Sequence, residues 1–100
     1  MRRTVLLAAE AESDLDGILR YIAAESPRAA VKLIDRLLDA VQGLAASAGH
    51  YPIILVHRDR QLRRRVVASY NLLFEVTANR VVVLRIVHGS RDLSRLFPED

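Results

Sequence analysis

The 100-residue sequence predicts a single α+β domain spanning residues 1–100. The predicted domain has an N-terminal strand, then an antiparallel helical hairpin packed on one face of a small, mainly antiparallel sheet. Two observations predict this class. Apolar residues recur at helical spacing in the first half and at every second position in much of the second half. One hundred residues also suffice for only one hydrophobic core.

The chain starts with a predicted strand and a predicted helix. Residues 4–8 are short and β-prone, which suits a first strand that pairs with a later part of the sheet. A helix is expected at residues 9–24, because apolar residues recur every three or four positions there and acidic residues gather at its start, where the helix dipole favours them. The apolar stripe comprises Ala11, Leu15, Ile18, Leu19 and Ile22.

A second helix is predicted to begin at Ser26-Pro27. Serine can accept hydrogen bonds from the first free amides of a helix, and proline in the first turn loses no hydrogen bond. Apolar residues from Ala30 to Ala45 then follow the helical period without interruption. Because the connection is so short, residues 9–47 should form an antiparallel helical hairpin.

The second half of the chain predicts a three-stranded meander. Residues 46–52 are read as a connector, and residues 53–56 fit a short strand or a loop equally well. From Leu62 the period is two, which indicates an antiparallel hairpin with Arg63 and Arg65 on the face opposite the apolar residues. Ala78-Asn79 suits a tight turn, since asparagine tolerates a left-handed backbone.

The last predicted strand, residues 81–87, is apolar on both faces apart from Arg85, as a covered central strand would be. A final helical turn is expected at residues 93–97. With the helical hairpin on one face of the sheet, the other face is expected to be concave and basic. Residues 53–61 receive no functional assignment.

Composition restricts the class of partner and of chemistry. The formal net charge is +3, and all but one of the 15 Lys and Arg residues are arginine. Arginine binds carboxylate or phosphate through two parallel hydrogen bonds, so an anionic partner such as nucleic acid or an acidic protein segment is expected, although an ordinary surface explains the charge equally well. Cysteine is absent, which excludes disulfides, Cys-based zinc sites and thiol nucleophiles.

Other features exclude further classes. No apolar run reaches the length of a membrane span, so a cytoplasmic location is expected. His50 and His57 lack carboxylates at metal-ligand spacing, and no metal or other cofactor is expected. Neither a phosphate-binding glycine loop nor a paired-carboxylate motif is present, which argues against an ordinary metabolic enzyme.

Several cations are candidate functional residues. The triplet Arg63, Arg64 and Arg65 could bind a phosphate backbone or an acidic peptide, or could protect a sheet edge from aggregation. Strict alternation would turn Arg64 toward the apolar face. Arg85 needs a counter-charge within its apolar strand, such as Glu75 or an incoming anion, and a structural salt bridge is the commoner arrangement.

The strand end holds a second candidate group. Gly89 has a permissive backbone that would let His88 and Arg91 face one pocket. There histidine could act as acid or base and arginine could stabilise charge during RNA cleavage. The alternative is a histidine bound to backbone, with Arg91 paired to Asp92 or Glu99.

These residues and their order resemble the RelE/ParE superfamily of bacterial type II toxin-antitoxin toxins over nearly the whole chain. The closing segment Val83-Leu-Arg-Ile-Val-His-Gly-Ser-Arg-Asp92 is the most specific and resembles the ParE-like branch most closely. Other matching segments are Ala11-Glu-Ser-Asp-Leu-Asp-Gly-Ile18, Tyr21-Ile22, Ser26-Pro27, Leu62-Arg63 and Val67-Ala-Ser-Tyr-Asn-Leu-Leu-Phe74.

The resemblance implies the RelE/ParE-like fold and a toxin neutralised by a cognate antitoxin in a hetero-oligomer. RelE-like members are ribosome-dependent mRNA endonucleases, whereas ParE-like members poison DNA gyrase through protein contact. This chain has Asn71 where the nuclease branch typically has arginine, and Phe97 near the position of its catalytic tyrosine.

The resemblance therefore favours a ParE-like gyrase inhibitor without catalytic residues. Two alternatives stay open. One is a mRNA endonuclease acting through His88, Arg91 and Arg64, and the other is an inactive toxin-fold protein. The residues expected to bind the target or the antitoxin are Arg63, Arg65, Arg85, His88 and Arg91.

Overall fold

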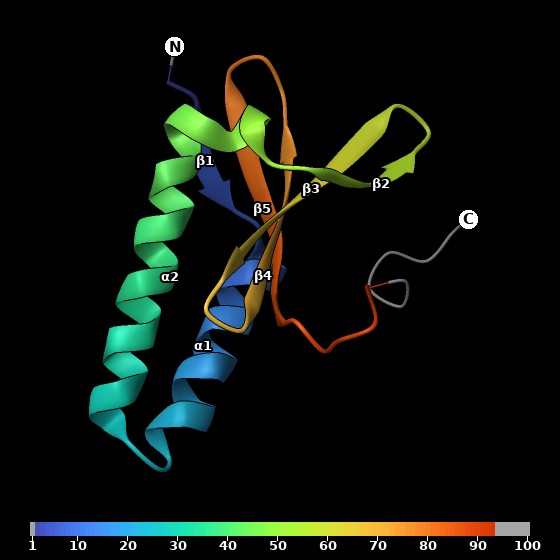
Figure 1. Ribbon diagram of the computed structural model, residues 1–100. Helices are drawn as coiled ribbons and strands as arrows, with labels where there is room; N and C mark the ends of the chain where they lie inside the picture. Colours follow the sequence, from blue (N-terminus) through green and yellow to red (C-terminus); the bar gives the residue numbers. More distant parts are fainter. Residues whose placement is uncertain (1, 94–100) are drawn as a thin grey trace.

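The computed structural model describes residues 2–93 and has the predicted α+β architecture (Figure 1). The elements follow the chain in the order β1 (Thr4–Leu7), α1 (Ala9–Ala23), α2 (Pro27–Ser47), the 3₁₀ turn η1 (Ala48–His50), β2 (Ile53–His57), β3 (Arg60–Val67), β4 (Tyr70–Val76) and β5 (Arg80–His88). Residues 53–56, for which the sequence left two alternatives, therefore form a strand. The helical turn predicted at residues 93–97 falls almost wholly outside the described residues.

The five strands form one sheet in the order β1-β5-β4-β3-β2. Strand β1 runs parallel to β5, and every other neighbouring pair is antiparallel. Both helices lie on one side of the sheet, and the β2–β3 hairpin extends away from them (Figure 1). Neither helix in the described part of the chain is long and apolar enough to cross a membrane.

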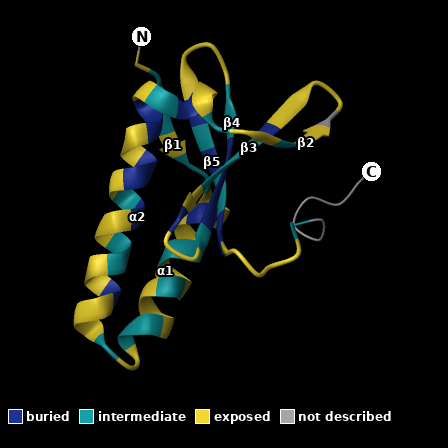
Figure 2. Cartoon of the chain, viewed as in Figure 1, coloured by how far each residue is buried: buried dark blue, intermediate teal, exposed yellow. Residues whose placement is uncertain are grey.

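The helical hairpin forms because its sequence signals agree with one another. Ser26 caps α2 by accepting a hydrogen bond of 3.2 Å from the amide of Ala29, and Pro27 opens the helix without losing a bond. Buried positions recur along one side of α2 while its outer side stays exposed (Figure 2). That buried stripe packs the hairpin against the sheet.

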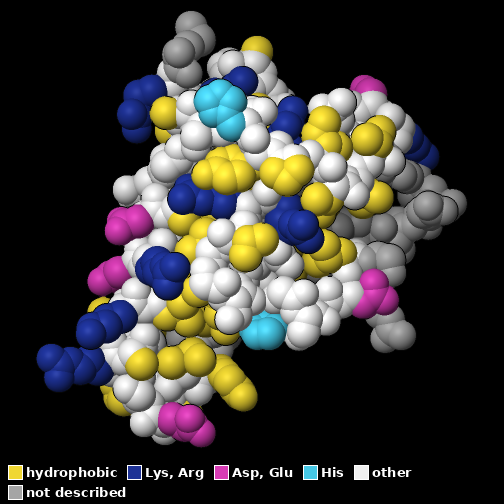
Figure 3. All heavy atoms as spheres, in the orientation of Figure 1, with side chains coloured by type: hydrophobic (Ala, Val, Ile, Leu, Met, Phe, Trp, Pro, Cys, Tyr) yellow, Lys and Arg dark blue, Asp and Glu magenta, His cyan; other side chains and the backbone are white. Residues whose placement is uncertain are grey.

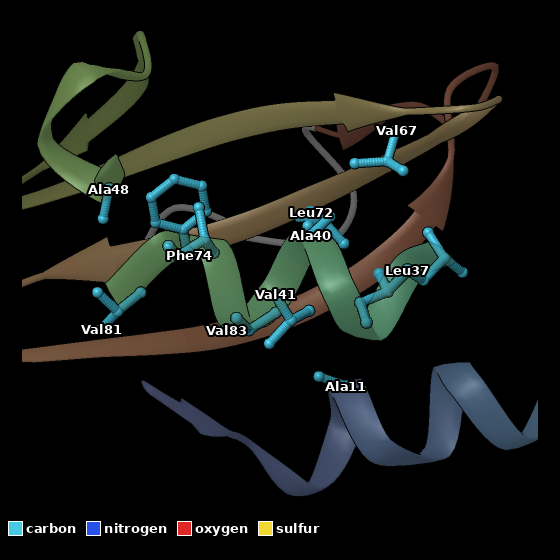
Figure 4. Packing of buried hydrophobic residues seen from close by; sticks show 12 residues of the cluster. Ala11, Leu37, Ala40, Val41, Ala48, Val67, Leu72, Phe74, Val81 and Val83 are labelled. Carbon is cyan, nitrogen blue, oxygen red and sulfur yellow. The ribbon is translucent and has the colours of Figure 1, made fainter. Parts of the chain in front are cut away.

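The main core lies between the helices and the sheet (Figure 4). Phe74 on β4 is fully buried, and the ring of Tyr51 meets it edge-on with centroids 6.1 Å apart. Leu37 and Leu44 of α2 cover the same face of the sheet with no exposed surface. These contacts fix the position of the hairpin on β4 and β5.

The opposite face of the sheet is apolar at its centre, contrary to the concave basic surface predicted. Leu62, Leu73 and Val87 form a second buried cluster there, which Ile54, Leu84 and Leu93 extend. Strand β4 is thus buried on both faces. The prediction was wrong because the alternation of β4 was read as one apolar and one polar face, although Leu73 is apolar on the second face.

A two-residue turn at Ala68-Ser69 reverses the faces expected for the arginines of β3. Val67 pairs with Tyr70 across this turn, so Arg65 lies opposite Leu72 and shares its helix-covered face. The prediction carried the alternation straight through the turn and placed Arg63 and Arg65 on the other side. Across a two-residue turn, odd-numbered residues of one strand pair with even-numbered residues of the next, as Val67 pairs with Tyr70.

Two hairpin turns contain residues with a left-handed backbone conformation that the sequence analysis did not predict. Among the described residues other than glycine, only Arg58 and Ala68 have positive φ, at 57° and 54°. Both occupy the first position of a two-residue hairpin turn, where a positive φ matches the twist of the strands. Asn79, the predicted left-handed residue, does not adopt that conformation.

Truncating the core at Phe74 should strongly destabilise the domain. Phe74→Ala removes a fully buried ring and should lower the free energy of unfolding by about 3–5 kcal/mol. Urea denaturation followed by circular dichroism would measure the change. Val31→Ala is the matched control, because Val31 is 55% exposed and its loss should change stability by less than about 0.5 kcal/mol. Equal effects of the two substitutions would contradict the packing described.

Candidate functional site

A carboxylate that accepts three hydrogen bonds joins α1 to β5. Arg85 donates two hydrogen bonds to the carboxylate of Asp14, with Nε to Oδ2 at 2.8 Å and Nη2 to Oδ1 at 2.9 Å. The same carboxylate accepts a bond of 2.9 Å from the amide of Ile86. Asp14 thus holds both the side chain and the backbone of β5.

This contact replaces a missing strand. Strand β1 pairs with β5 only from Thr4–Arg80 to Leu7–Val83, so the second half of β5 has no neighbour on that side within the described residues. The amide of Ile86 would be left without an acceptor there. Asp14 fills that place from the first half of α1.

Partial burial strengthens the pair. The side chains of Arg85 and Asp14 are 21% and 15% exposed. The hydrogen bond to Asp14 raises the pKa of the Arg85 guanidinium above its usual value against the opposing effect of burial, and the charges of Asp14 and Glu10 add smaller contributions in the same direction. Arg85 is therefore held as a permanent cation with its charge already partnered.

The salt bridge favoured for Arg85 is present, but its partner is Asp14 and not Glu75, the residue suggested as an example. Glu75 instead accepts a bidentate pair from Arg60, whose Nε lies 2.8 Å from Oε2. This hydrogen bonding raises the pKa of Arg60 above its ordinary value. The Arg60 side chain is 62% exposed, so the pair contributes at most about 1 kcal/mol to stability. Sequence spacing could not have identified Asp14, which lies 71 residues from Arg85.

Arg63 and Arg65 bind backbone carbonyls of the segment after η1 and of α2. Arg63 Nη1 donates to the carbonyl of Tyr51 at 2.6 Å, and Arg65 Nη1 donates to the carbonyl of Ala40 at 2.9 Å. The guanidinium of Arg65 also lies 5.3 Å from the centroid of the Tyr51 ring, a cation–π distance. A side chain at Gly43 would approach Arg65 Nη1 to 3.2 Å, so glycine leaves room for it.

His88 is held locally at the end of β5. Its Nδ1 lies 2.8 Å from the hydroxyl oxygen of Ser90 and accepts from the Ser90 amide at 3.2 Å. The ring of Tyr70 meets it edge-on at 5.5 Å. Arg91 reaches this group through its backbone, which donates to the carbonyl of His88 at 3.0 Å. The side chains of His88 and Arg91 are exposed.

Glycine suits position 89 for a different reason from the one predicted. Its φ is not positive, so no special conformation requires glycine here. Instead, a side chain would lie 3.3 Å from the carbonyl oxygen of Ser69, which accepts from the Gly89 amide at 2.7 Å. Close approach of the β3–β4 turn to the end of β5 is the constraint.

Arg64 and His88, two of the residues considered for RNA cleavage, lie on opposite faces of the sheet. Arg64 pairs with Leu73, whereas His88 pairs with Tyr70, and these two positions of β4 face opposite sides. The backbone therefore directs Arg64 and His88 to opposite sides of the sheet. No cluster of three or more His, Asp or Glu within residues 2–93 could hold a metal ion.

A groove lies between α2 and the end of β3. Its volume is about 380 Å³, and its walls come from Arg36, Asp39, Ala40 and Gly43 on one side and residues 65–68 on the other. Sequence analysis did not predict this groove, because no motif marks either wall.

Exposed apolar side chains gather on β2 and β3. Ile53, Leu55, Val56 and Val66 are between 39% and 62% exposed. Figure 3 shows apolar and cationic side chains intermingled over this part of the molecule. A mixture of apolar and cationic groups is typical of a protein-binding surface rather than of a catalytic cleft.

Solved structures that share this fold include chains of three toxin-antitoxin systems. The chromosomal ParDE toxin-antitoxin system of P. aeruginosa includes a chain with a TM-score of 0.70 and 19% identity, covering 87% of this chain and 96% of that one. A chain of the RelE-RelB complex of Pyrococcus horikoshii OT3 has a TM-score of 0.64 and 15% identity, with 92% and 100% covered. A chain of the Mycobacterium tuberculosis complex RelBE2 has a TM-score of 0.58 and 22% identity, with 88% and 99% covered.

The fold is thus that of a toxin-antitoxin protein of the RelE/ParE type. The family described as "ParE toxin of type II toxin-antitoxin system, parDE" matches residues 5–93, which is most of the chain. A comparison of this chain with curated protein sequences found no match. The chain belongs to the ParE toxin family of type II toxin-antitoxin systems.

Removing the charge of Asp14 should loosen α1 from β5. Asp14→Asn keeps the size of the side chain but weakens three hydrogen bonds, two of them from the Arg85 guanidinium, so the free energy of unfolding should fall by about 2 kcal/mol. Chemical denaturation would measure it.

Asp16→Asn provides the control on the same helix. Asp16 pairs with Arg20 at the surface, where both side chains are more than half exposed, and its loss should change the free energy by less than about 0.5 kcal/mol. A similar small effect of both substitutions would show that the Asp14 contact does not stabilise the fold.

Proposed function

We propose that this ParE-family toxin stops growth by binding DNA gyrase and that a cognate antitoxin neutralises it. The observation that carries the proposal is the separation of Arg64 from His88 on opposite faces of the sheet. General acid–base catalysis needs its groups within hydrogen-bonding reach of one substrate. The arrangement therefore supports action by protein contact rather than by RNA cleavage.

The buried position of Asn71 gives further support. Asn71 is 3% exposed, so the residue that stands where the nuclease branch typically has arginine does not reach the surface. It could not contact an RNA substrate without rearrangement of β4. Membership of the ParE family, rather than of a nuclease family, supports the same proposal.

An antitoxin partner fits the exposed surface. The chain has a net charge of +3 and presents exposed apolar side chains on β2 and β3. A flexible acidic segment with apolar residues could bury that surface and pair its cations. The structural relatives named above were solved as toxin-antitoxin systems or complexes.

The five residues predicted to bind the target or the antitoxin have different surroundings. His88 and Arg91 are exposed and available to a partner. Arg63, Arg65 and Arg85 already bind carbonyls or Asp14 within the chain. Their role in partner binding stays a prediction.

Expression of the chain alone in bacteria should stop DNA synthesis before protein synthesis. Pulse labelling with thymidine and amino acids within minutes of induction would measure both. Early loss of thymidine incorporation, reversed by co-expression of the antitoxin, is the expected result. The purified chain should then inhibit supercoiling by gyrase.

The same experiment separates the alternatives. Early loss of amino-acid incorporation, together with transcript cleavage abolished by His88→Ala or Arg91→Ala, would overturn the gyrase proposal in favour of an endonuclease. Normal growth without the antitoxin would identify an inactive toxin fold. If the chain inhibits gyrase, transcripts should stay intact with the unchanged chain and with either substitution.

A further inference from the structure

Positive charge collects at the end of the sheet where β1 begins and where β4 turns into β5. The segments that build this end are residues 2–9, 40–58 and 76–91, and they contain none of the 12 acidic residues of the chain. Figure 3 shows cationic and histidine side chains, without acidic ones, around the start of the chain. The charges of this protein are therefore segregated rather than mixed at this end.

Backbone hydrogen bonds join these segments. The amide of Arg3 donates to the carbonyl of Ala45 at 2.7 Å, and the amide of Thr4 donates to the carbonyl of Asn79 at 3.0 Å. The first described residues thus connect the end of α2 to the β4–β5 turn. We name the resulting surface the basic end; its members are Arg2, Arg3, His50, Arg63 and Arg80.

Neutral acceptors hold two of its arginines in place. Arg3 Nε donates to the carbonyl of Thr77 at 2.9 Å, and Arg63 Nη1 donates to the carbonyl of Gly49 at 3.3 Å. A side chain at Gly49 would lie 3.9 Å from Arg3 Nη1, so both guanidinium groups lie beside η1. Because a carbonyl has no net charge, these bonds fix the two arginines without neutralising them.

No carboxylate offsets the charge of the basic end. Its five members make no ion pair with an acidic residue among residues 2–93. Glu75, which precedes the β4–β5 turn, is already paired with Arg60. Helix α2 ends beside this surface, but its C-terminal dipole is equivalent to only about half a negative charge. The four arginines therefore leave a net positive field.

The surrounding side chains favour a polyanion over a protein surface. Residues 2–4, 46–50 and 77–80 contain no apolar residue larger than alanine. A protein interface usually has an apolar centre depleted in charge, as the exposed residues of β2 and β3 could provide. A phosphate backbone is instead bound by arginines together with hydroxyl and amide groups, and Thr4 and Asn79 are exposed here.

We propose that the basic end binds the phosphate backbone of duplex DNA, and that in the inhibited complex this is the DNA held by gyrase. The choice of DNA rests on the proposed function, because gyrase acts on DNA. Arg2, His50 and Arg80 are exposed and contact the phosphates, while Arg3 and Arg63 strengthen the positive field behind them. Contacts to phosphate carry no sequence information, so this binding is independent of DNA sequence.

Arg2→Gln combined with Arg80→Gln tests the phosphate contacts. The probe is a fluorescently labelled DNA duplex of mixed sequence, titrated with the purified full chain and followed by anisotropy at several salt concentrations. If about three phosphates are bound, the logarithm of the affinity should fall against the logarithm of the salt concentration with a slope of about −2.7. The double variant should reduce the slope to about −0.9 and weaken binding about tenfold or more at low salt.

Arg28→Gln combined with Lys32→Gln is the matched control. It removes the same net charge from exposed side chains in the first half of α2. Lys32 lies about 20 Å from the end of the helix, beyond the Debye length of about 10 Å at 0.1 M salt, so DNA binding should change less than about twofold. Equal losses in the two double variants would overturn the assigned surface, because net charge alone would then explain the binding.

Competition with other polyanions identifies the source of the charge. Unlabelled duplex DNA should displace the probe at a lower concentration of charged groups than single-stranded RNA or polyglutamate. More effective displacement by RNA would assign the basic end to an RNA backbone, and more effective displacement by polyglutamate would assign it to an acidic protein segment. Either result would overturn the choice of DNA.

A supercoiling assay separates this inference from the proposed function. The Arg2→Gln, Arg80→Gln variant should need about fivefold more protein than the unchanged chain to inhibit gyrase, whereas the control should not. Full inhibition by a variant that no longer binds DNA would overturn the DNA contact and leave the proposed function standing. Failure of the unchanged chain to inhibit gyrase would overturn the proposed function and the choice of gyrase-held DNA, while anisotropy would still confirm or refute DNA binding at the basic end.

Discussion

The fold depends on the unequal lengths of β1 and β5. Strand β1 has four residues and β5 has nine, so half of the longer strand must find another neighbour. Helix α1 takes that place and contributes Asp14, which accepts from the Ile86 amide and from the Arg85 side chain. One carboxylate thereby continues the sheet edge and fixes the helical hairpin against it.

The arginines of the sheet then divide into two groups. Arg63, Arg65 and Arg85 bind groups within the chain and hold the hairpin, η1 and β5 in place. The side chains of Arg36 on α2, Arg64 on β3 and Arg91 after β5 make no hydrogen bond to another described residue. Arginine suits both tasks, because its fixed array of donors can satisfy several acceptors at once and stays charged when partly buried. The high arginine content is therefore only partly a signal of an anionic partner.

Much of the fold could be predicted from the sequence. The cap at Ser26-Pro27 and the apolar stripe of α2 define the helical hairpin locally, and the period of two defines β3 and β4. The face of Arg63 and Arg65 could not be predicted, because Ala68-Ser69 lacks the glycine or asparagine that usually marks a two-residue turn. The partner of Arg85 was equally hidden, since Asp14 has the appearance of an ordinary acidic residue in the first half of a helix.

The candidate site was less predictable than the fold for a physical reason. The groove between α2 and the end of β3 lies beyond the last residue of β3 that pairs with β2, and that boundary depends on the register of the β2–β3 hairpin and its irregularity between Ile53 and Leu55. No residue type marks such a boundary in the sequence.

The parallel pairing of β1 with β5 also bears on how the chain folds during synthesis. Thr4 and Arg80 are neighbours in the sheet, so the first strand cannot find its place until the last strand has left the ribosome. The helical hairpin, by contrast, consists of contacts between residues close in sequence and can form early. A nascent chain would therefore present an exposed amphipathic hairpin before any complete sheet exists. Binding by a chaperone or by the antitoxin at that stage would precede the appearance of a finished toxin.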